Sequence, residues 1–296
     1  MKRGQFYIPG DTWIYYKIYL MPGLSDPFLV RVMYPLLCRF YQEKKIRLWY
    51  FIRYTDPDFH LRIRIRLEST DYLTPVLKAV RKELYPWLQK GKIKNVQLDT
   101  YQREYDRYGS HTIQWFEELF FHDSIAIAML LTNLDLDNDH EQDMRWLSAI
   151  KSTDRYLNDF GLSFETRKNF LYQLFSKLSD EMPGYSDFIH RISLRFRVNR
   201  KQLERVMYSN EKNERINIFD ERSRNNRDAV KHILTHESRK RLEVPLPRLI
   251  ASILHLSLNR LFATHQHLNE LATYVLLFRY YKAKLGREKY DKGYKL

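Results

Sequence analysis

One short segment of the chain carries a dense and regular set of basic side chains. Residues 60–67 read HLRIRIRL, so a β-strand would place His60, Arg62, Arg64 and Arg66 on one face and four aliphatic side chains on the other. We expect the aliphatic face to pack into the core. The guanidinium groups would lie about 7 Å apart and repel one another. Carboxylates, water or a bound anion could each offset that repulsion, and antiparallel sheets often leave one face in water.

A second candidate group follows at residues 101–109, which read YQREYDRYG. In a helical turn, Glu104 and Arg107 lie on one face, so the carboxylate could hold the guanidinium fork ready for a carboxylate or carbonyl from outside. The alternative is a surface ion pair with little effect on stability. Gly109 is expected to end the turn.

The third candidate is the sequence HLSLNR at residues 255–260, inside an apolar segment that Pro245 and Pro247 open. His255 and Asn259 are four residues apart and therefore stack on one helix face. The amide could orient the imidazole, and basic surroundings would keep the ring unprotonated and able to act as a base. A hydrogen-bonded histidine in the core is the alternative interpretation.

Three strands are expected to position the basic segment. Residues 13–19, 48–54 and 61–67 are rich in β-branched and aromatic side chains, and turn formers bound each of them. The sequence TDPD at residues 55–58 is a turn signal. It predicts that the second and third strands pair as an antiparallel hairpin.

Two helices and a further strand complete this part of the chain. Residues 28–41 have helical apolar spacing and follow the sequence SDP, which supplies a cap and a proline for the first turn. A helix is also predicted near residues 72–89 and a strand near residues 95–100. Together these elements form a small α+β unit.

After residue 110 the apolar spacing becomes helical. The chain is therefore predicted to be a single α+β domain over residues 1–296, in which a small, mostly antiparallel sheet in residues 1–110 packs with a mainly helical part in residues 111–296. Residues 189–206 fit a strand or a helix, and the charged residues 200–227 fit a mobile excursion or a solvated helix. The six predicted helices span residues 111–131, 143–160, 163–179, 229–237, 246–262 and 267–284.

The composition limits the class of protein. The net charge of +14 favours nucleic acid, anionic lipid or acidic peptide as partner without selecting one. The single cysteine, Cys38, excludes an internal disulfide and a cysteine-rich zinc site. The sequence has no signal peptide, no membrane span and no glycine loop for phosphate, so we expect a cytoplasmic protein without a metal or an organic cofactor.

In their order along the chain, these segments resemble the C-terminal elimination domain of class I lantibiotic dehydratases, which is also known as a thiopeptide-type bacteriocin biosynthesis domain. The matching segments are residues 13–18, 49–64, 101–109 and 255–260. The segment at residues 49–64 is quite specific to this family. The segment at residues 255–260 is weak evidence alone and becomes persuasive because it follows the other segments in the family's order. The resemblance spans nearly the whole chain and implies an elimination domain that stands alone.

The resemblance also implies the site. The family's functional histidine, arginines and glutamate fall on His255, Arg107, Arg62 or Arg64, and Glu104, and both strand arginines are kept as candidates. The neighbouring positions that would bind substrate are His60, Arg53, Tyr108, Asn259 and Arg260.

The implied reaction is removal of glutamate from glutamylated serine or threonine in a bacteriocin-type precursor peptide, which leaves dehydroalanine or dehydrobutyrine. A separate dehydratase subunit that uses glutamyl-tRNA would supply the glutamylated peptide, and a cyclase and a second copy of the chain are further candidate partners. Elimination must remove a weakly acidic α-proton while the leaving carboxylate, with a pKa of about 4, needs no protonation. Arginines suit the developing oxyanion and the carboxylates, and His255 suits the base.

Two alternatives stay open. Relatives in thiopeptide pathways form a pyridine ring by cycloaddition, although they depart from the elimination residues that this chain keeps. A binding module without catalysis, for tRNA or for the leader of the precursor, would explain the charge of +14. The sequence contains no recognisable RNA-binding motif that would support a tRNA-binding module.

Overall fold

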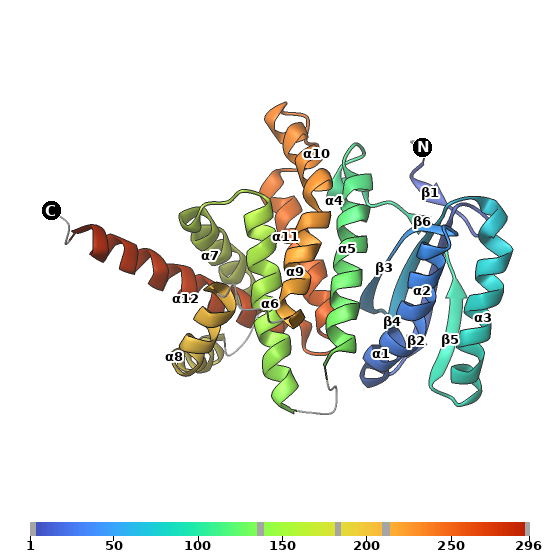
Figure 1. The fold of residues 1–296 in the computed structure, drawn as a ribbon, viewed down its shortest axis with the longest axis horizontal. Coiled ribbons are helices and arrows are strands. Elements are labelled where there is room, and N and C mark those ends of the chain that lie inside the picture. Colours follow the sequence, from blue (N-terminus) through green and yellow to red (C-terminus); the bar gives the residue numbers. More distant parts are fainter. Residues whose placement is uncertain (1–3, 135–138, 181–184, 209–213, 294–296) are drawn as a thin grey trace.

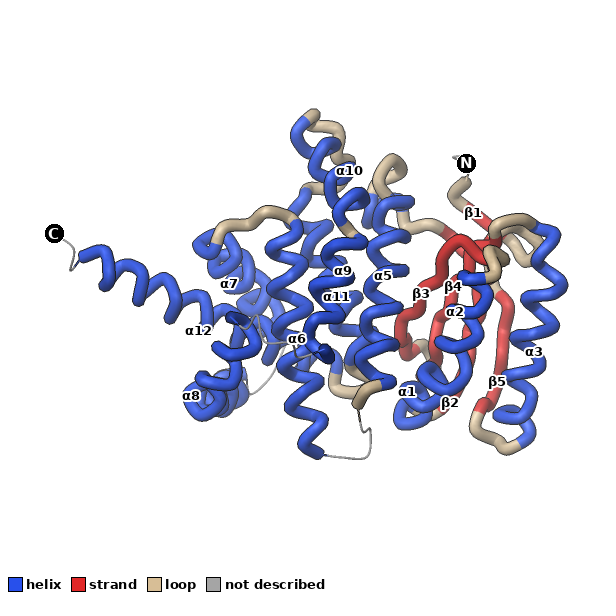
Figure 2. The backbone as a smooth tube through the Cα atoms, in the orientation of Figure 1, coloured by secondary structure: helices blue, strands red, loops and turns tan. Residues whose placement is uncertain are grey.

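The structure, a computed structural model, describes residues 4–134, 139–180, 185–208 and 214–293. A sheet with its helices forms one end of the molecule and a bundle of helices forms the rest (Figures 1 and 2). The predicted α+β class is confirmed, with the sheet in the N-terminal third and the helices after it. Among the described residues, no helix is long and apolar enough to cross a membrane.

The sheet is antiparallel, with four strands in the order β3-β4-β2-β5. The predicted hairpin is confirmed, because β3 pairs with β4 from Thr55 opposite Phe59 to Ile46 opposite Leu67. The aliphatic side chains of β4 are buried as expected. A separate two-stranded ribbon joins β1 (Phe6–Tyr7) to β6 (Tyr101–Gln102). The four sheet strands are β2 (Trp13–Leu20), β3 (Ile46–Thr55), β4 (Phe59–Leu67) and β5 (Ile93–Leu98).

The first helical run begins earlier than predicted. It starts at Pro22, so Pro27 lies inside α1 and Ser25 does not cap it; the Ser25 hydroxyl donates to the carbonyl of Pro22 at 2.6 Å. Tertiary contacts explain the difference, because the buried Asp26 pairs with Arg53 and Arg145 and so draws this segment into the helix. The elements of this run and of the following one are α1 (Pro22–Phe28), the π-helical turn η1 (Leu29–Met33), α2 (Tyr34–Gln42), the 3₁₀ turn η2 (Thr70–Tyr72) and α3 (Leu73–Gln89).

The six helices predicted after residue 110 are present, with ends shifted by a few residues, except that the last helix runs to Gly293 and not to the predicted end at residue 284. The ambiguous residues 189–206 are helical. The charged residues 200–227 belong to helices except for Asn226, which forms the turn between two of them, and for 209–213, which lie outside the described residues. The last helix runs beyond the others toward the C-terminus (Figure 1). The helices are α4 (Tyr105–Tyr108), α5 (Ile113–Thr132), α6 (Asp139–Asp159), α7 (Phe164–Asp180), α8 (Tyr185–Tyr208), α9 (Glu214–Asn225), α10 (Arg227–Ser238), α11 (Leu246–Leu261) and α12 (Gln266–Gly293).

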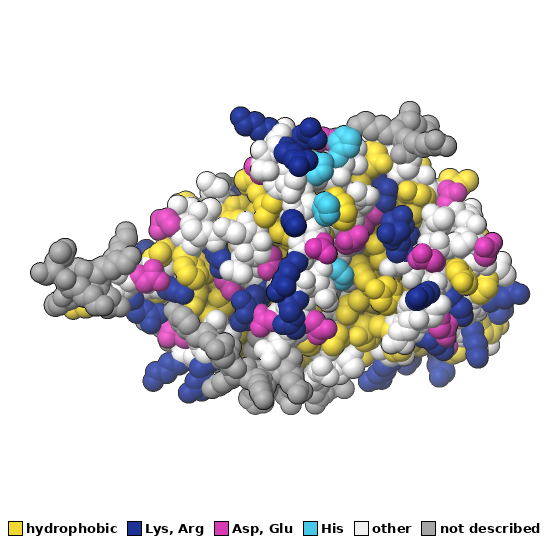
Figure 3. Space-filling view, turned by 45° about the horizontal axis from the view of Figure 1, so that its top comes forward, with side chains coloured by type: hydrophobic (Ala, Val, Ile, Leu, Met, Phe, Trp, Pro, Cys, Tyr) yellow, Lys and Arg dark blue, Asp and Glu magenta, His cyan; other side chains and the backbone are white. Residues whose placement is uncertain are grey.

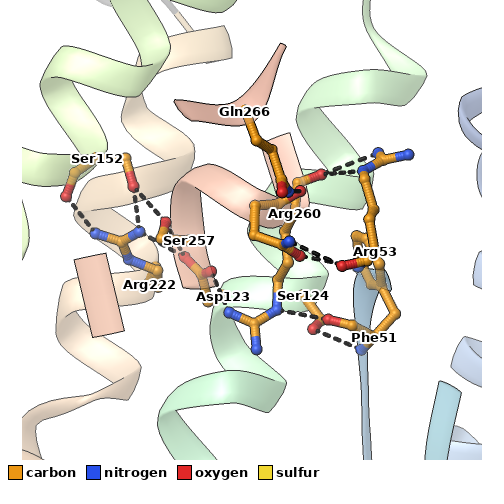
Figure 4. A network of polar contacts seen from close by, with 10 residues as sticks. Phe51, Arg53, Asp123, Ser124, Ser152, Arg222, Ser257, Arg260 and Gln266 are labelled. Carbon is orange, nitrogen blue, oxygen red and sulfur yellow. Dashed lines mark hydrogen bonds and ion pairs between the residues drawn. The ribbon is translucent and has the colours of Figure 1, made fainter. Parts of the chain in front are cut away.

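Side chains of α5 and α11 satisfy the outer edge of β3, where the bundle meets the sheet (Figure 4). The backbone N–H of Arg53 donates to Asn259 Oδ1, and Asn259 Nδ2 donates to the carbonyl of Arg53, both at 2.8 Å. Two residues away, the N–H of Phe51 donates to Ser124 Oγ at 3.3 Å, and Arg260 Nε donates to the Phe51 carbonyl at 2.8 Å. Buried backbone groups need such partners, so these side chains replace a neighbouring strand.

Asp123 of α5 joins this edge to the rest of the bundle (Figure 4). Its Oδ2 accepts from Arg260 Nη1 at 2.9 Å, while its Oδ1 accepts from Arg222 Nη1 at 2.7 Å and from Ser257 Oγ at 3.0 Å. The side chains of the aspartate and both arginines are fully buried. One carboxylate therefore holds α5, α9 and α11 together.

We expect Asp123→Asn to lower the free energy of unfolding by about 3–5 kcal/mol, because it removes the charge that neutralises two buried guanidinium groups. Urea denaturation would measure the difference. Glu237→Gln, at an exposed position of α10, is the control and should change stability by less than about 0.5 kcal/mol. Equal stability of the two variants would contradict a structural role for the Asp123 charge.

Candidate active site

A cavity of about 280 Å³ opens between the β3–β4 hairpin, α4 and α11. Its lining includes Arg62, Arg64, Glu104, Arg107 and His255, so the structure brings together the five residues that the sequence nominated for catalysis. Side chains at its rim reach solvent, because those of Arg107 and His255 are 38% and 37% exposed. The cavity is therefore open to a ligand.

Arg64 is the most unusual of these residues, because its charge is buried without an opposite charge. Its side chain lies next to the rings of Tyr15, Tyr50 and Tyr101, with the guanidinium carbon 4.5, 5.4 and 5.1 Å from the ring centroids. Its Nε has no hydrogen-bond partner, and no ion pair to Arg64 occurs within the described residues. The solvated-face interpretation is thus wrong for Arg64, which is 6% exposed. Burial alone would lower the pKa of Arg64, but the three tyrosines and the carboxylate of Glu104 outweigh it and raise that pKa. A bound anion would give the guanidinium the direct ion pair that it lacks.

The tyrosines around Arg64 are fixed by a buried chain of hydrogen bonds. Tyr50 donates its hydroxyl to Tyr101 at 2.7 Å, and Tyr101 donates to Glu117 Oε1 at 2.8 Å. The fork of Arg103 closes the chain on Glu117 at 2.7 and 2.5 Å. Burial raises the pKa of Tyr50 and of Tyr101, so both stay neutral phenols at physiological pH. The chain of hydrogen bonds occupies Glu117, so Arg64 is left with the tyrosine ring faces and with the carboxylate of Glu104, which acts on its charge without forming an ion pair.

His60 lies behind Arg62 and not in the lining of the cavity. Arg62 Nε can only donate, and it lies 3.0 Å from His60 Nε2, so that nitrogen must accept; His60 Nδ1 then donates to the carbonyl of Asp58 at 2.8 Å. Burial is the main cause that lowers the pKa of His60, which agrees with a neutral ring. The guanidinium of Arg62 also stacks 3.5 Å from the ring centroid of Tyr54. His60 and Tyr54 thus orient Arg62 toward the cavity.

Arg107 and Glu104 lie at the rim, and their predicted shared face is confirmed. Arg107 Nη1 is 3.5 Å from Glu104 Oε2, and Arg107 Nε donates to Ser252 Oγ of α11 at 3.3 Å. Gly109 ends the turn with a φ of 78°, a conformation that glycine adopts readily. The neighbouring Tyr108 is buried and lines the cavity, as its nomination for substrate binding requires.

His255 has a partner that the sequence did not reveal. Its Nδ1 lies 2.9 Å from Oε2 of Glu270, a buried residue of α12, and Glu270 Oε1 accepts from the hydroxyl of Tyr274 at 2.8 Å. The expectation that Asn259 orients His255 is wrong, because its amide bonds to the backbone of Arg53. The sequence did contain one signal for this partner: Glu270 and Tyr274 stand four residues apart in a largely apolar segment, which indicates a buried glutamate with a hydrogen-bond donor one turn away.

Three residues nominated for substrate binding have partners inside the protein. The side chain of Arg53 donates to Ser25 Oγ, to Asp26 Oδ1 and to the carbonyl of Arg260. Arg53 and Asn259 contribute to the lining, whereas Arg260 does not. Their polar groups hold α11 against β3, and this contact places His255 opposite the strand arginines.

The chain belongs to the family described as lantibiotic biosynthesis dehydratase C-term, which it matches over residues 13–281. Among curated proteins it is 24% identical to subtilin biosynthesis protein SpaB of Bacillus subtilis over 172 residues, or 55% of this chain and 16% of SpaB. It is 29% identical to nisin biosynthesis protein NisB of Lactococcus lactis subsp. lactis over 142 residues, or 46% of this chain and 13% of NisB. Each match therefore spans less than a fifth of the curated relative.

Solved structures share the fold. The tRNA-dependent lantibiotic dehydratase MibB from Microbispora sp. 107891 has a TM-score of 0.69 and 22% identity, over 94% of this chain and 29% of MibB. The pyridine synthase TbtD from thiomuracin biosynthesis has a TM-score of 0.67 and 12% identity, over 92% of this chain and 100% of TbtD. One fold thus occurs within a dehydratase and as a pyridine synthase.

We expect Arg64→Met to leave the free energy of unfolding unchanged or to raise it by up to about 2 kcal/mol. The substitution removes a desolvated charge that has no ion pair, together with its contacts to the ring faces, and methionine still packs against the tyrosine rings. Arg53→Met is the matched comparison and should destabilise by about 3–5 kcal/mol, because the Arg53 guanidinium is fully hydrogen-bonded. Chemical denaturation measures both, and a large loss of stability for Arg64→Met would contradict the unpaired state of Arg64.

Proposed function

We propose that the chain removes glutamate from glutamylated serine or threonine residues of a bacteriocin-type precursor peptide and leaves dehydroalanine or dehydrobutyrine. The observation that carries the proposal is the buried, unpaired guanidinium of Arg64 in the same cavity as His255. Such a cavity offers a positive charge for an anion and a nitrogen base for a proton. A β-elimination that expels a carboxylate uses both.

In the proposed reaction His255 takes the α-proton of the modified residue. The C–H electron pair forms the Cα=Cβ bond, the Cβ–O bond breaks, and glutamate leaves as a carboxylate. Negative charge develops on the adjacent peptide carbonyl, where one preorganised donor is typically worth about 100- to 1000-fold in rate. A well-placed general base contributes about 100- to 10,000-fold. Because the carboxylate is a weak base, the reaction needs no acid at the leaving group.

The arginines have different surroundings, which supports different roles. Arg64 is surrounded by aromatic rings and largely shielded from water, which strengthens its interaction with a developing charge, so we assign it to the oxyanion. Arg62 and Arg107 are more accessible and are held by His60 and Ser252. They suit the carboxylates of the glutamyl group, which a guanidinium can bind with two parallel hydrogen bonds.

The proposed partners are the glutamylated precursor peptide and a separate cytoplasmic subunit that attaches glutamate from glutamyl-tRNA. On the face shown in Figure 3, basic and acidic side chains are interspersed and do not form one continuous basic surface. With a net charge of +14, the protein should attract polyanions of any kind, and added salt should weaken this binding. Elimination itself needs no tRNA, because glutamate arrives already esterified to the peptide.

A pyridine-forming cycloaddition is the second candidate, and the likeness to TbtD over its whole length favours it. That reaction joins dehydroalanine residues through carbon–carbon bonds and expels no carboxylate from an ester. An anion site beside a base suits elimination better. The two candidates differ in substrate, so one set of peptides separates them.

The decisive experiment gives the purified protein a chemically made glutamyl-ester peptide in the presence of a metal chelator and nuclease, at near-physiological salt. We expect free glutamate and a peptide that contains an alkene, both detected by mass spectrometry. A parallel sample receives a peptide with preformed dehydroalanines. Cyclisation of that peptide without glutamate release in the first sample would favour the pyridine synthase. Glutamate release that requires added tRNA would overturn the proposal.

We expect His255→Ala and Arg107→Ala to fold normally and to slow glutamate release by at least about 100-fold, because each removes a group assigned to the reaction. Mass spectrometry should then show that the ester adduct persists. His267→Ala and Arg248→Ala are matched controls at exposed positions away from the lining and should act at the wild-type rate. If either variant releases glutamate as fast as its control, the role assigned to the substituted residue is wrong.

A further inference from the structure

The carboxylate of Glu270 lies outside the cavity, on the side of His255 that faces α12. An ionised carboxylate only accepts hydrogen bonds, so a neutral His255 ring must carry its proton on Nδ1 to bond with Glu270 Oε2 at 2.9 Å. The lone pair then lies on Nε2, the opposite nitrogen of the ring. We infer that Glu270 is a positioning residue that makes Nε2 of His255 the proton acceptor of the site.

Tyr274 holds the other oxygen of the same carboxylate. Its hydroxyl donates to Glu270 Oε1 at 2.8 Å, one helical turn along α12. Burial, followed by the charge of Glu270, raises the pKa of Tyr274, so the hydroxyl stays a donor. Each oxygen of Glu270 thus has one fixed donor. The carboxylate cannot turn away from His255 without losing a buried hydrogen bond, which typically leaves an unsatisfied group at a cost of about 1–3 kcal/mol.

The charge of Glu270 also matters after His255 has taken a proton. An imidazolium in this cavity is repelled by the neighbouring guanidinium groups, and an ion pair with Glu270 offsets that repulsion. Without the carboxylate, the ring can present either nitrogen to the cavity, and the protonated ring is destabilised. The other charged and titratable groups that line the cavity with His255 are Tyr50, Arg53, Tyr54, Arg62, Arg64, Tyr101, Glu104, Arg107 and Tyr108.

This inference deepens the proposed elimination and rests on it, so its test includes a measurement that needs no substrate. Nitrogen-15 NMR of histidine-labelled protein distinguishes the two neutral forms of the ring. We expect wild-type His255 to carry its proton on Nδ1. Glu270→Ala removes the acceptor of the Nδ1 proton and should therefore populate the form with the proton on Nε2, whereas the isosteric Glu270→Gln keeps one acceptor oxygen and should change the spectrum less.

In the glutamyl-ester assay we expect Glu270→Ala to lower kcat by at least about 10-fold, because carboxylates that orient metal-bound histidines contribute about 10- to 100-fold and one behind a catalytic base can contribute more, with KM changed less than about twofold. Glu270→Gln should fall between Glu270→Ala and the wild type. Glu237→Gln on α10 is the control and should match the wild type in both measurements.

The outcomes separate the two proposals. If wild-type protein releases no glutamate, the elimination proposal fails, and the NMR spectrum still decides whether Glu270 sets the protonation of His255. If Glu270→Ala leaves the spectrum unchanged, or if it keeps the wild-type kcat, the inference about Glu270 is overturned.

Discussion

The contact between the edge of β3 and the side chains of α11 determines the geometry of the cavity. Asn259 and Arg260 bond to the backbone of two β3 residues, and the carboxylate of Asp123 holds Arg260 in place. His255 precedes Asn259 by four residues on the same helix, which is a rise of about 6 Å along the axis. The register that seals the sheet edge thereby also sets where His255 stands relative to the arginines of β4. The buried polar groups at this contact are satisfied only when the bundle and the sheet are together.

The arginines fall into two sets that differ in their partners. Arg53, Arg222 and Arg260 are buried in ion pairs with aspartates, although Arg222 Nε and Arg260 Nη2 have no hydrogen-bond partner. Arg64 is also buried, yet it faces aromatic rings and open space, since the nearby Glu117 is bound to Arg103 and Tyr101. A buried guanidinium without a counter-charge opposes folding and favours an anionic ligand. The family resemblance and the missing ion pair of Arg64 both indicate the same cavity as the functional site.

Local patterns predicted a large part of this structure. Alternation in residues 60–67 identified β4 and its buried aliphatic face, and the turn sequence at 55–58 identified the hairpin. The helices of the C-terminal part followed from apolar spacing. Alternation could not reveal whether Arg64 meets water, because that depends on tyrosines contributed by three other strands.

The missed features depend on contacts between distant residues. The helix start at Pro22 reflects the burial of Asp26 against Arg53 and Arg145. Helical spacing correctly placed Asn259 on the same face as His255. The spacing could not show that the side-chain amide of Asn259 bonds to the backbone of Arg53 in β3 and not to the imidazole. Glu270 lies beyond the loop after α11, and only the packing of α12 on α11 brings it to the imidazole.

The sealed edge of β3 also restricts how a peptide can be recognised. Many proteins capture an extended peptide as an additional strand, which requires a row of unused backbone donors and acceptors at a sheet edge. The N–H and C=O groups of Phe51 and Arg53 are already occupied by Ser124, Asn259 and Arg260. Beside the cavity, β3 therefore cannot accept a guest strand. A peptide that reaches His255 along this side must be read by side chains, which recognise chemical groups and not the main chain that all peptides share.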